Sequence, residues 1–231
     1  MFAGHYAASF GAGRLERRIP LWHLFIATQF LDIAWCVFIL LGIEKARFAF
    51  GLGSTPLDLY YMPYTHSLPG ALTLSCLGAI VYAGAVSPSA RRSLRTALVI
   101  GFAIFSHWIF DLISHRPDLP LYGNEHKLGF SVGNQQGLEL TLEAGILLAS
   151  LLFYVRGSTL RKSRKMGLYA VIATVLLIQV FRTFGPPEPS VHARAAALLA
   201  YYILLTAGCW ITSSGHEANG GEHRRKSAAA S

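Results

Sequence analysis

Charged residues are scarce in this sequence. Asp, Glu, Lys and Arg make up 14% of its 231 residues, while 53% are hydrophobic. Soluble domains carry roughly 25% charged residues, so this composition excludes an ordinary soluble domain. The sequence therefore predicts an integral membrane protein, with residues 1–212 forming a single domain of packed transmembrane helices.

Cysteines are also few, and their number is odd. Cys36, Cys76 and Cys209 all lie within apolar runs, which excludes a disulfide framework and a CxxC metal motif. The N-terminal residues lack the basic segment, long apolar run and small-residue cleavage site of a signal peptide, so we expect no cleavable one. The chain also lacks an internal repeat and the paired broken helices that many transporters contain.

The basic residues are unevenly distributed. The formal net charge is +8, and 14 of the 20 lysines and arginines fall in four clusters, at residues 14–18, 91–95, 156–165 and 224–226. Each cluster borders an apolar run, which is the pattern of membrane topology rather than of a nucleic-acid surface. We therefore expect no nucleic-acid partner, a multi-pass topology and a C-terminus on the cytoplasmic side.

The apolar runs predict an all-α fold with about six transmembrane helices. Residues 2–13 are too few to span a bilayer, which takes about 20. They form either a half-helix that carries His5 to the middle of the membrane or an amphipathic anchor on its inner surface. Residues 213–231 are polar and small and are expected to be disordered. The expected spans are residues 21–42, 66–86, 97–115, 136–155, 166–184 and 193–212.

Three ionisable residues follow one another along the third expected span. His107, Asp111 and His115 are spaced i, i+4, i+8 and share one face of a helix. The bilayer penalises each of them, so their default interpretation is functional. His107 and His115 lie about 12 Å apart along the axis. These three residues therefore bind two ions, or two of them bind one ion and the third is a partner that orients a ligand.

Other polar residues fall at overlapping predicted depths. They are Asp32 near the middle of the first span, His66 at the outer start of the second, and Glu139 and Glu143 in the outer half of the fourth. Imidazole and carboxylate groups are ligands of divalent metals, and zinc is the metal we expect. Such an ion would activate water, with Glu143 as general base and Asp32 as a ligand or as a partner that orients a histidine.

Four segments have a distinctive pattern of polar residues. They are Gly4-His5-Tyr6, Gln29-Phe30-Leu31-Asp32, Tyr64-Thr65-His66-Ser67-Leu68, and Ser106 to Asp111 with His115 to Leu121. Together they resemble a family of bacterial inner-membrane proteins described as membrane-bound metal-dependent hydrolases and sometimes as permeases. The resemblance covers about residues 2–145, and it implies a metal-assisted hydrolase of the bacterial inner membrane that acts on a lipid or small molecule. It implies site roles for His5, Asp32, His66, His107 and Asp111, whereas His115 and Glu143 are candidates from their positions alone.

Two other functions are compatible with the same residues. A small ion-coupled permease could use intramembrane His, Asp and Glu side chains to relay protons or to bind a cation. A purely structural membrane protein could use them as a polar network that holds its helices together. Under every alternative, membrane lipid is the expected surrounding partner.

Overall fold

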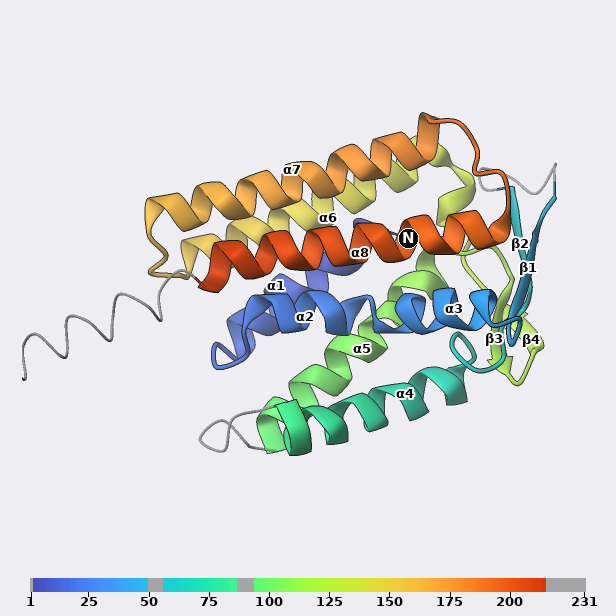
Figure 1. Ribbon diagram of the computed structural model, residues 1–231, viewed down its shortest axis with the longest axis horizontal. Helices are drawn as coiled ribbons and strands as arrows, with labels where there is room; N and C mark the ends of the chain where they lie inside the picture. The colour runs from blue at the N-terminus through green and yellow to red at the C-terminus, as the bar shows by residue number, and fades with distance from the viewer. Residues whose placement is uncertain (1, 50–55, 87–93, 215–231) are drawn as a thin grey trace, which may run out of the picture.

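The computed structural model describes residues 2–49, 56–86 and 94–214, which form a bundle of helices with two small β-hairpins at one end (Figure 1). Four helices in this part of the chain are long and apolar enough to cross a membrane. Large hydrophobic side chains cover their outward faces; Leu98, Phe102 and Leu177 are at least 60% exposed. The expected all-α, multi-pass membrane class is confirmed. The four helices are α5 (Leu94–Ser114), α6 (Gln136–Arg156), α7 (Lys162–Phe184) and α8 (Val191–Ser214).

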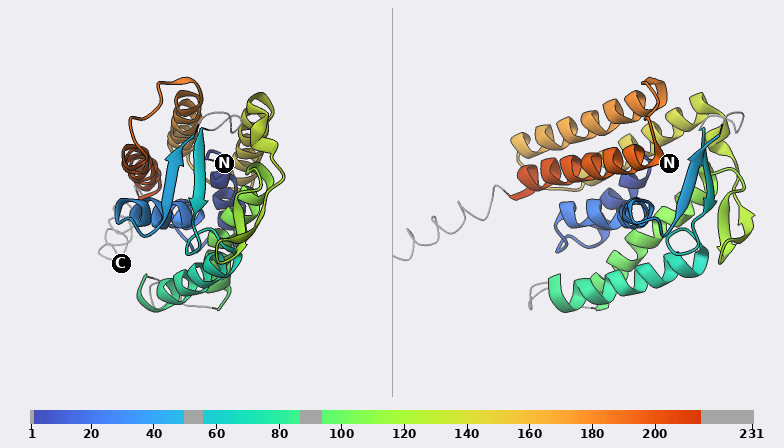
Figure 2. Two further views of the ribbon diagram at one scale, coloured as in Figure 1. Left: turned by 90° about the vertical axis from the view of Figure 1, so that its right-hand side faces the viewer. Right: turned by 45° about the vertical axis from the view of Figure 1, so that its right-hand side comes forward.

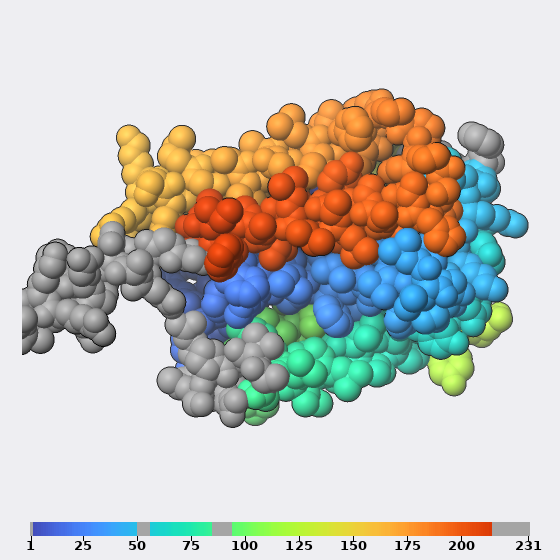
Figure 3. All heavy atoms as spheres, viewed as in Figure 1, coloured from blue at the N-terminus to red at the C-terminus, as the bar shows by residue number. Residues whose placement is uncertain are grey.

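The first two expected spans differ from the simple helices that the sequence predicts. The run at residues 21–42 forms α2 (Leu21–Thr28) and α3 (Phe30–Leu40), which meet at Gln29 with a bend of 52° and together qualify as one span. The run at residues 66–86 forms α4 (Leu68–Val81) and a π-helical turn, Tyr82–Val86. This apolar helix is shorter than the four long ones. On the face seen in Figure 3, α8 lies between α7 and the α2–α3 pair.

The N-terminal helix α1 (His5–Leu15) lies inside the bundle. It packs against α6, α2 and α5, and His5, Tyr6 and Phe10 are fully buried. Small residues on α1 permit this close approach, since the α1 sequence consists largely of Ala, Gly and Ser between its aromatic side chains. The structure therefore agrees with the half-helix interpretation of residues 2–13 rather than with a surface anchor.

Two segments expected as loops contain antiparallel hairpins. In one, β1 (Lys45–Phe48) pairs with β2 (Leu57–Tyr61); in the other, β3 (Leu119–Tyr122) pairs with β4 (Glu125–Leu128). Figure 2 shows both hairpins at the end of the bundle where α3 and α5 finish. A short 3₁₀ turn, Val132–Asn134, leads into α6. Of the expected tail, residues 213 and 214 belong to the last turn of α8, and residues 215–231 lie outside the described part.

Described parts of three basic clusters gather at the opposite end of the bundle. Arg14 and Arg17 both donate hydrogen bonds to the carbonyl of Gly157, and Arg95 donates to the carbonyl of Leu15. Charges clustered at one end are what a positive-inside topology requires.

Glu16 pairs with two arginines at this basic end and makes the stability of the end depend on pH. Both of its carboxylate oxygens accept hydrogen bonds from the Arg18 guanidinium at 2.8 Å, and Arg95 Nε lies 3.4 Å from Oε2. The Arg18 hydrogen bond lowers the pKa of Glu16 from 4.5 to about 2. The stabilisation is therefore fully present above pH about 4.5 and is lost as the pH falls toward about 2.

We expect Glu16→Gln to lower the free energy of unfolding by about 1 kcal/mol near neutral pH, because it removes a bidentate ion pair that is partly exposed. Thermal unfolding of both proteins in detergent, followed by circular dichroism from pH about 7 to about 3, measures the effect. The gap should close as the pH falls below about 4.5. A gap that stays constant with pH would contradict this account.

Candidate metal centre

Asp111 lies at the centre of the polar cluster. Helix α5 is apolar around it and buries His107 and Asp111, which are 0% and 2% exposed and one turn apart. One oxygen of Asp111, Oδ2, lies 3.2 Å from His107 Nε2 and 3.5 Å from His66 Nε2. The other oxygen, Oδ1, lies 3.2 Å from His5 Nε2 and 3.5 Å from His115 Nε2. Four imidazoles from distant parts of the chain therefore surround one carboxylate.

A second carboxylate closes this arrangement into a ring of four ligand atoms. Asp32 Oδ1 lies 3.4 Å from His66 Nε2 and 3.4 Å from His107 Nε2. Together with Asp111 Oδ2, these atoms alternate nitrogen and oxygen around a closed circuit, and every neighbouring pair is 3.2–3.5 Å apart. We call Asp32, His66, His107 and Asp111 the four-ligand set.

The distances in the four-ligand set match those between neighbouring ligands of one metal ion. Ligand atoms about 2.0–2.1 Å from zinc in a tetrahedron are separated by about 3.3 Å. A charge-assisted hydrogen bond would be shorter, at about 2.7–2.9 Å. His107 Nε2 is buried and makes no hydrogen bond within the described residues. The set could therefore hold a divalent cation, and Asp32, His66 and His107 bring their ligand atoms within 4.8 Å of one another.

The break between α2 and α3 fixes the orientation of His107. His107 Nδ1 lies 2.8 Å from the carbonyl of Thr28, the last residue of α2. A carbonyl only accepts, so Nδ1 carries a proton, and in the neutral imidazole Nε2 keeps its lone pair. The bend at Gln29 makes this carbonyl available and also begins α3 just before Asp32.

His66 is oriented by a relay of two other side chains. The Thr65 hydroxyl donates to Glu44 Oε2 at 2.6 Å, so its oxygen accepts from His66 Nδ1 at 2.7 Å. Glu44 also accepts from the backbone N–H groups of Tyr64 and Thr65. Ser67 caps α4 by accepting from Gly70 N. In its neutral form His66 therefore presents the lone pair of Nε2 from the start of α4, and the outer partners orient the ring as carboxylates orient histidines in metal sites.

Asp32 and His115 have supporting partners of their own. Tyr202 on α8 donates to Asp32 Oδ2 at 2.6 Å, which leaves Oδ1 facing the two histidines. His115 Nδ1 lies 2.8 Å from Asp118 Oδ1, so it donates that proton and directs Nε2 toward Asp111. The His115–Asp118 pair lies just beyond α5, in the turn before the second hairpin.

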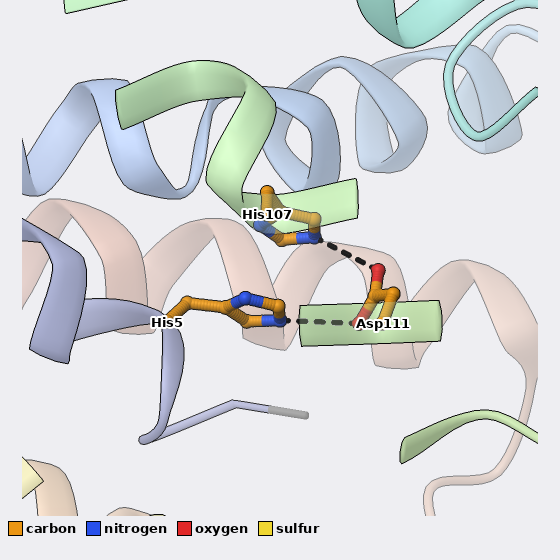
Figure 4. A group of neighbouring side chains, drawn as sticks. All are labelled: His5, His107 and Asp111. Carbon is orange, nitrogen blue, oxygen red and sulfur yellow. Dashed lines mark ion pairs between the residues drawn. The ribbon is translucent and has the colours of Figure 1, made fainter. Parts of the chain in front are cut away.

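His5 reaches the cluster from α1 and stacks on His107. The ring centroids are 3.7 Å apart and the planes differ by 6°. Figure 4 shows His5 and His107 approaching Asp111 from two different helices. His5, His107 and Asp111 also bring ligand atoms within 4.8 Å of one another. Because the two oxygens of Asp111 face different histidine pairs, His107 and His115 share one carboxylate despite their separation along α5.

Glu143, the expected general base, is held by backbone N–H groups near the start of α1. It is fully buried, and its Oε2 accepts from the backbone N–H groups of Phe2 and Gly4 at 2.9 and 2.8 Å. Gln179 donates to Oε1 at 3.2 Å. These bonds satisfy free N–H groups where α1 begins, and a carboxylate is favourable there. Glu143 thus positions the segment that carries His5.

A cavity of about 290 Å³ opens beside the cluster, at the hairpin end of the bundle. Asp32, His66, Asp111 and His115 line it, as does Glu143. Its volume is at the lower end of the range for ligand sites. His5 and His107 are not in the lining, because Asp111 and the backbone cover them. A substrate in the cavity would therefore meet His115 directly.

Several supporting residues had no role in the sequence interpretation. Asp118 follows His115 by three residues, and Thr65 adjoins His66, so local spacing could have indicated both. Glu44 and Tyr202 come from an expected loop and from the last span, and no local pattern connects them with the site.

Comparisons of this chain with protein-family models, with curated proteins and with solved structures found no match. The function is therefore argued from the site alone.

We expect purified protein to hold a divalent metal, with zinc preferred, and Asp111→Asn and His107→Ala to lose it. Asp111 supplies charge to the four-ligand set and His107 supplies a nitrogen. Elemental mass spectrometry on detergent-purified protein measures the metal content. His192→Ala, which changes an exposed histidine on α8, is the control and should retain the metal. Equal metal content in Asp111→Asn and wild type would contradict the assignment.

We expect Thr65→Val to lower zinc affinity by about 10–100-fold, the usual cost of removing an outer partner of a ligating histidine. The valine keeps the shape but cannot accept from His66 Nδ1. Competition with a zinc-binding dye measures the affinity. Thr141→Val provides the matched control, because Thr141 is exposed and bonds only to Gly137 of its own helix. A similar loss in both variants would show that the relay has no special role.

Proposed function

We propose that this protein is a membrane-bound, metal-dependent hydrolase that cleaves an ester or phosphoester. The observation that carries the proposal is the closed circuit of four nitrogen and oxygen atoms, each 3.2–3.5 Å from the next, beside a cavity. A polar network that only held the helices together would pair its donors and acceptors at hydrogen-bond distance. In this cluster the imidazole nitrogens and carboxylate oxygens are instead 3.2–3.5 Å apart, a spacing that supports a shared metal ion.

The four-ligand set would hold the metal. Bound there, a divalent cation would supply Lewis acidity, which lowers the pKa of a coordinated water and polarises an ester or phosphoryl oxygen. His115 is the group that would accept the proton of the attacking water, because it lines the cavity and Asp118 fixes its ring. The same imidazole would return that proton to the leaving oxygen. His5 and Glu143 would keep Asp111 and the N-terminal segment in place.

The location of the protein is part of the proposal. We place it in a bacterial inner membrane, with the basic end and the C-terminus on the cytoplasmic side and the hairpin end outside. The support is the clustering of arginines from separate basic segments around Gly157 and Leu15 at one end. In this orientation the cavity faces the outer half of the bilayer, and a lipid-borne or small-molecule substrate could enter from there.

We expect the zinc-loaded protein in detergent to hydrolyse p-nitrophenyl phosphate or a p-nitrophenyl ester, and His115→Gly to lower kcat by about 10²–10⁴-fold. Zinc content should remain that of wild type, because His115 is outside the four-ligand set. Added imidazole should restore part of the rate in His115→Gly. Product absorbance measures the rates. Glu143→Gln is the comparison variant, because Glu143 is a buried carboxylate that is not expected to exchange protons.

Three results would overturn this mechanism. Unchanged kcat in His115→Gly would remove its proton-transfer role. A larger kcat loss in Glu143→Gln, with zinc and folding intact, would restore Glu143 as the base. Cation-driven uptake into proteoliposomes that depends on Asp111, without hydrolysis of either substrate, would favour a permease.

A further inference from the structure

The cavity has a second wall, opposite in chemistry to the metal centre. Arg182 lies in the last turn of α7 and Arg194 in the first turn of α8, on either side of the loop at residues 185–190. Both line the same cavity as His66, Asp111 and His115. Figure 1 shows the start of α8 beside the first hairpin, and α8 contacts β1.

The guanidinium groups on this wall lack full partners. Arg194 is 8% exposed, and its buried Nε and Nη1 atoms make no hydrogen bond within the described residues. Its Nε lies 3.5 Å from Glu188 Oε2. Arg182 Nε is likewise buried without a hydrogen bond, and no described carboxylate forms an ion pair with Arg182. Its guanidinium lies over the ring of Phe2, at 4.7 Å.

Most of the carboxylates lining the cavity are already engaged. Asp32 and Asp111 belong to the four-ligand set, and Glu143 is held by backbone N–H groups and Gln179. Asp118 accepts from His115 and lies 3.1 Å from Arg116 Nε. A buried guanidinium without a full counter-charge is costly. Two further carboxylates, Glu139 and Glu188, also line the cavity, and Glu188 is the one near Arg194. A ligand that enters this cavity therefore meets two guanidiniums whose N–H donors are not all hydrogen-bonded.

The charge of these arginines selects among the substrates that the proposed function allows. A carboxylic ester is neutral and would add no counter-charge to either guanidinium. A phosphate monoester carries about −1.5 to −2 charges at neutral pH and offers three acceptor oxygens. The planar guanidinium fork matches two of those oxygens at once. The unpaired donors thus complement a phosphoryl group and not an acyl group.

We propose that Arg182 and Arg194 form a phosphoryl-binding subsite and that the substrate is a phosphate monoester. This inference rests on the proposed hydrolase function and names its substrate class. The water oxygen forms a new bond to phosphorus while the ester P–O bond breaks, and its electron pair leaves with the alcohol oxygen. One water proton passes through His115 to that alcohol oxygen and the other stays on the phosphate. The products are an alcohol and inorganic phosphate, whose non-bridging oxygens the arginines hold.

The test uses inorganic phosphate as the probe and full-length, zinc-loaded protein in detergent. We expect phosphate to raise the thermal unfolding temperature of wild type, because it binds only the folded state. Arg182→Gln and Arg194→Gln should each weaken phosphate affinity, measured by titration calorimetry, by about tenfold or more, the loss for one charge-assisted hydrogen bond. Arg47→Gln is the matched control, an exposed arginine paired with Asp58 at the same end of the molecule.

Stability separates a binding role from a structural one. Without phosphate, Arg194→Gln should unfold at or above the wild-type temperature, since it removes a buried charge that is poorly paired. Arg194→Lys should retain part of the phosphate affinity. Marked destabilisation of Arg194→Gln without phosphate, together with unchanged phosphate affinity in Arg182→Gln, would overturn the subsite.

The outcomes also separate this inference from the metal centre. Zinc bound at wild-type level with no phosphate binding would refute the subsite and leave the centre standing. Phosphate binding that depends on both arginines in protein that holds no metal would support the subsite and refute the hydrolase. Release of phosphate from a short-chain phosphatidic acid but not from glycerol phosphate would identify a lipid source, and the reverse would identify a soluble one. Hydrolysis of carboxylic esters only would overturn the assignment.

Discussion

The carboxylate of Asp111 is the group on which the rest of the site depends. Placing a carboxylate inside an apolar bundle is costly unless its charge is compensated and its lone pairs are used. Here four imidazole nitrogens approach its two oxygens within 3.5 Å. They come from α1, from the start of α4, from α5 and from the turn after α5. To hold Asp111, the fold must bring together residues separated by more than a hundred positions, and this requirement explains why a short helix of small residues lies in the centre of the bundle.

The site also explains why several helices begin, end or bend inside the bundle. Backbone N–H and C=O groups cannot stay unpaired at membrane depth, so irregular backbone is tolerated only where it is buried in protein or lines a cavity. The carbonyl of Thr28 at the α2–α3 bend pairs with His107, and the N–H groups at the start of α1 pair with Glu143. Trp108 on α5 donates to the carbonyl of His66 ahead of α4. Each break thus supplies a backbone group that either orients a ligand or is satisfied by a neighbour of the site.

The sequence predicted the membrane class and the residues of the cluster because both depend on strong local signals. Apolar runs locate helices, and a rare ionisable residue within such a run stands out against the cost of burying it. His107 and Asp111 could also be paired from helical spacing alone. The sequence could not indicate that Asp111 uses both oxygens, or that His115 joins through one of them, because those facts depend on rotamers. Glu143 shows where depth in the membrane is not informative enough. Its depth predicted a general base, but the structure shows it accepting hydrogen bonds from backbone N–H groups of a segment 139 or more residues away. The two hairpins escaped prediction because each strand is only four or five residues long.

The two walls of the cavity differ in how far their buried polar groups are paired, and therefore in their free-energy cost to folding. This difference bears on the function of each wall. The metal wall is internally compensated: every histidine around Asp111 except His5 has a partner that fixes its tautomer. The arginine wall is compensated only in part. Buried N–H groups of Arg182 and Arg194 make no hydrogen bond among the described residues, and the carboxylate of Glu188 lies 3.5 Å from Arg194 Nε. A structural network would be expected to satisfy both walls, because unpaired buried donors destabilise the folded chain. Donors without a full partner in the free protein can gain one from a ligand, and the hydrogen bonds formed then contribute to the binding free energy. This contrast is the reason to propose Arg182 and Arg194 as substrate-binding residues and the histidines and aspartates as metal ligands.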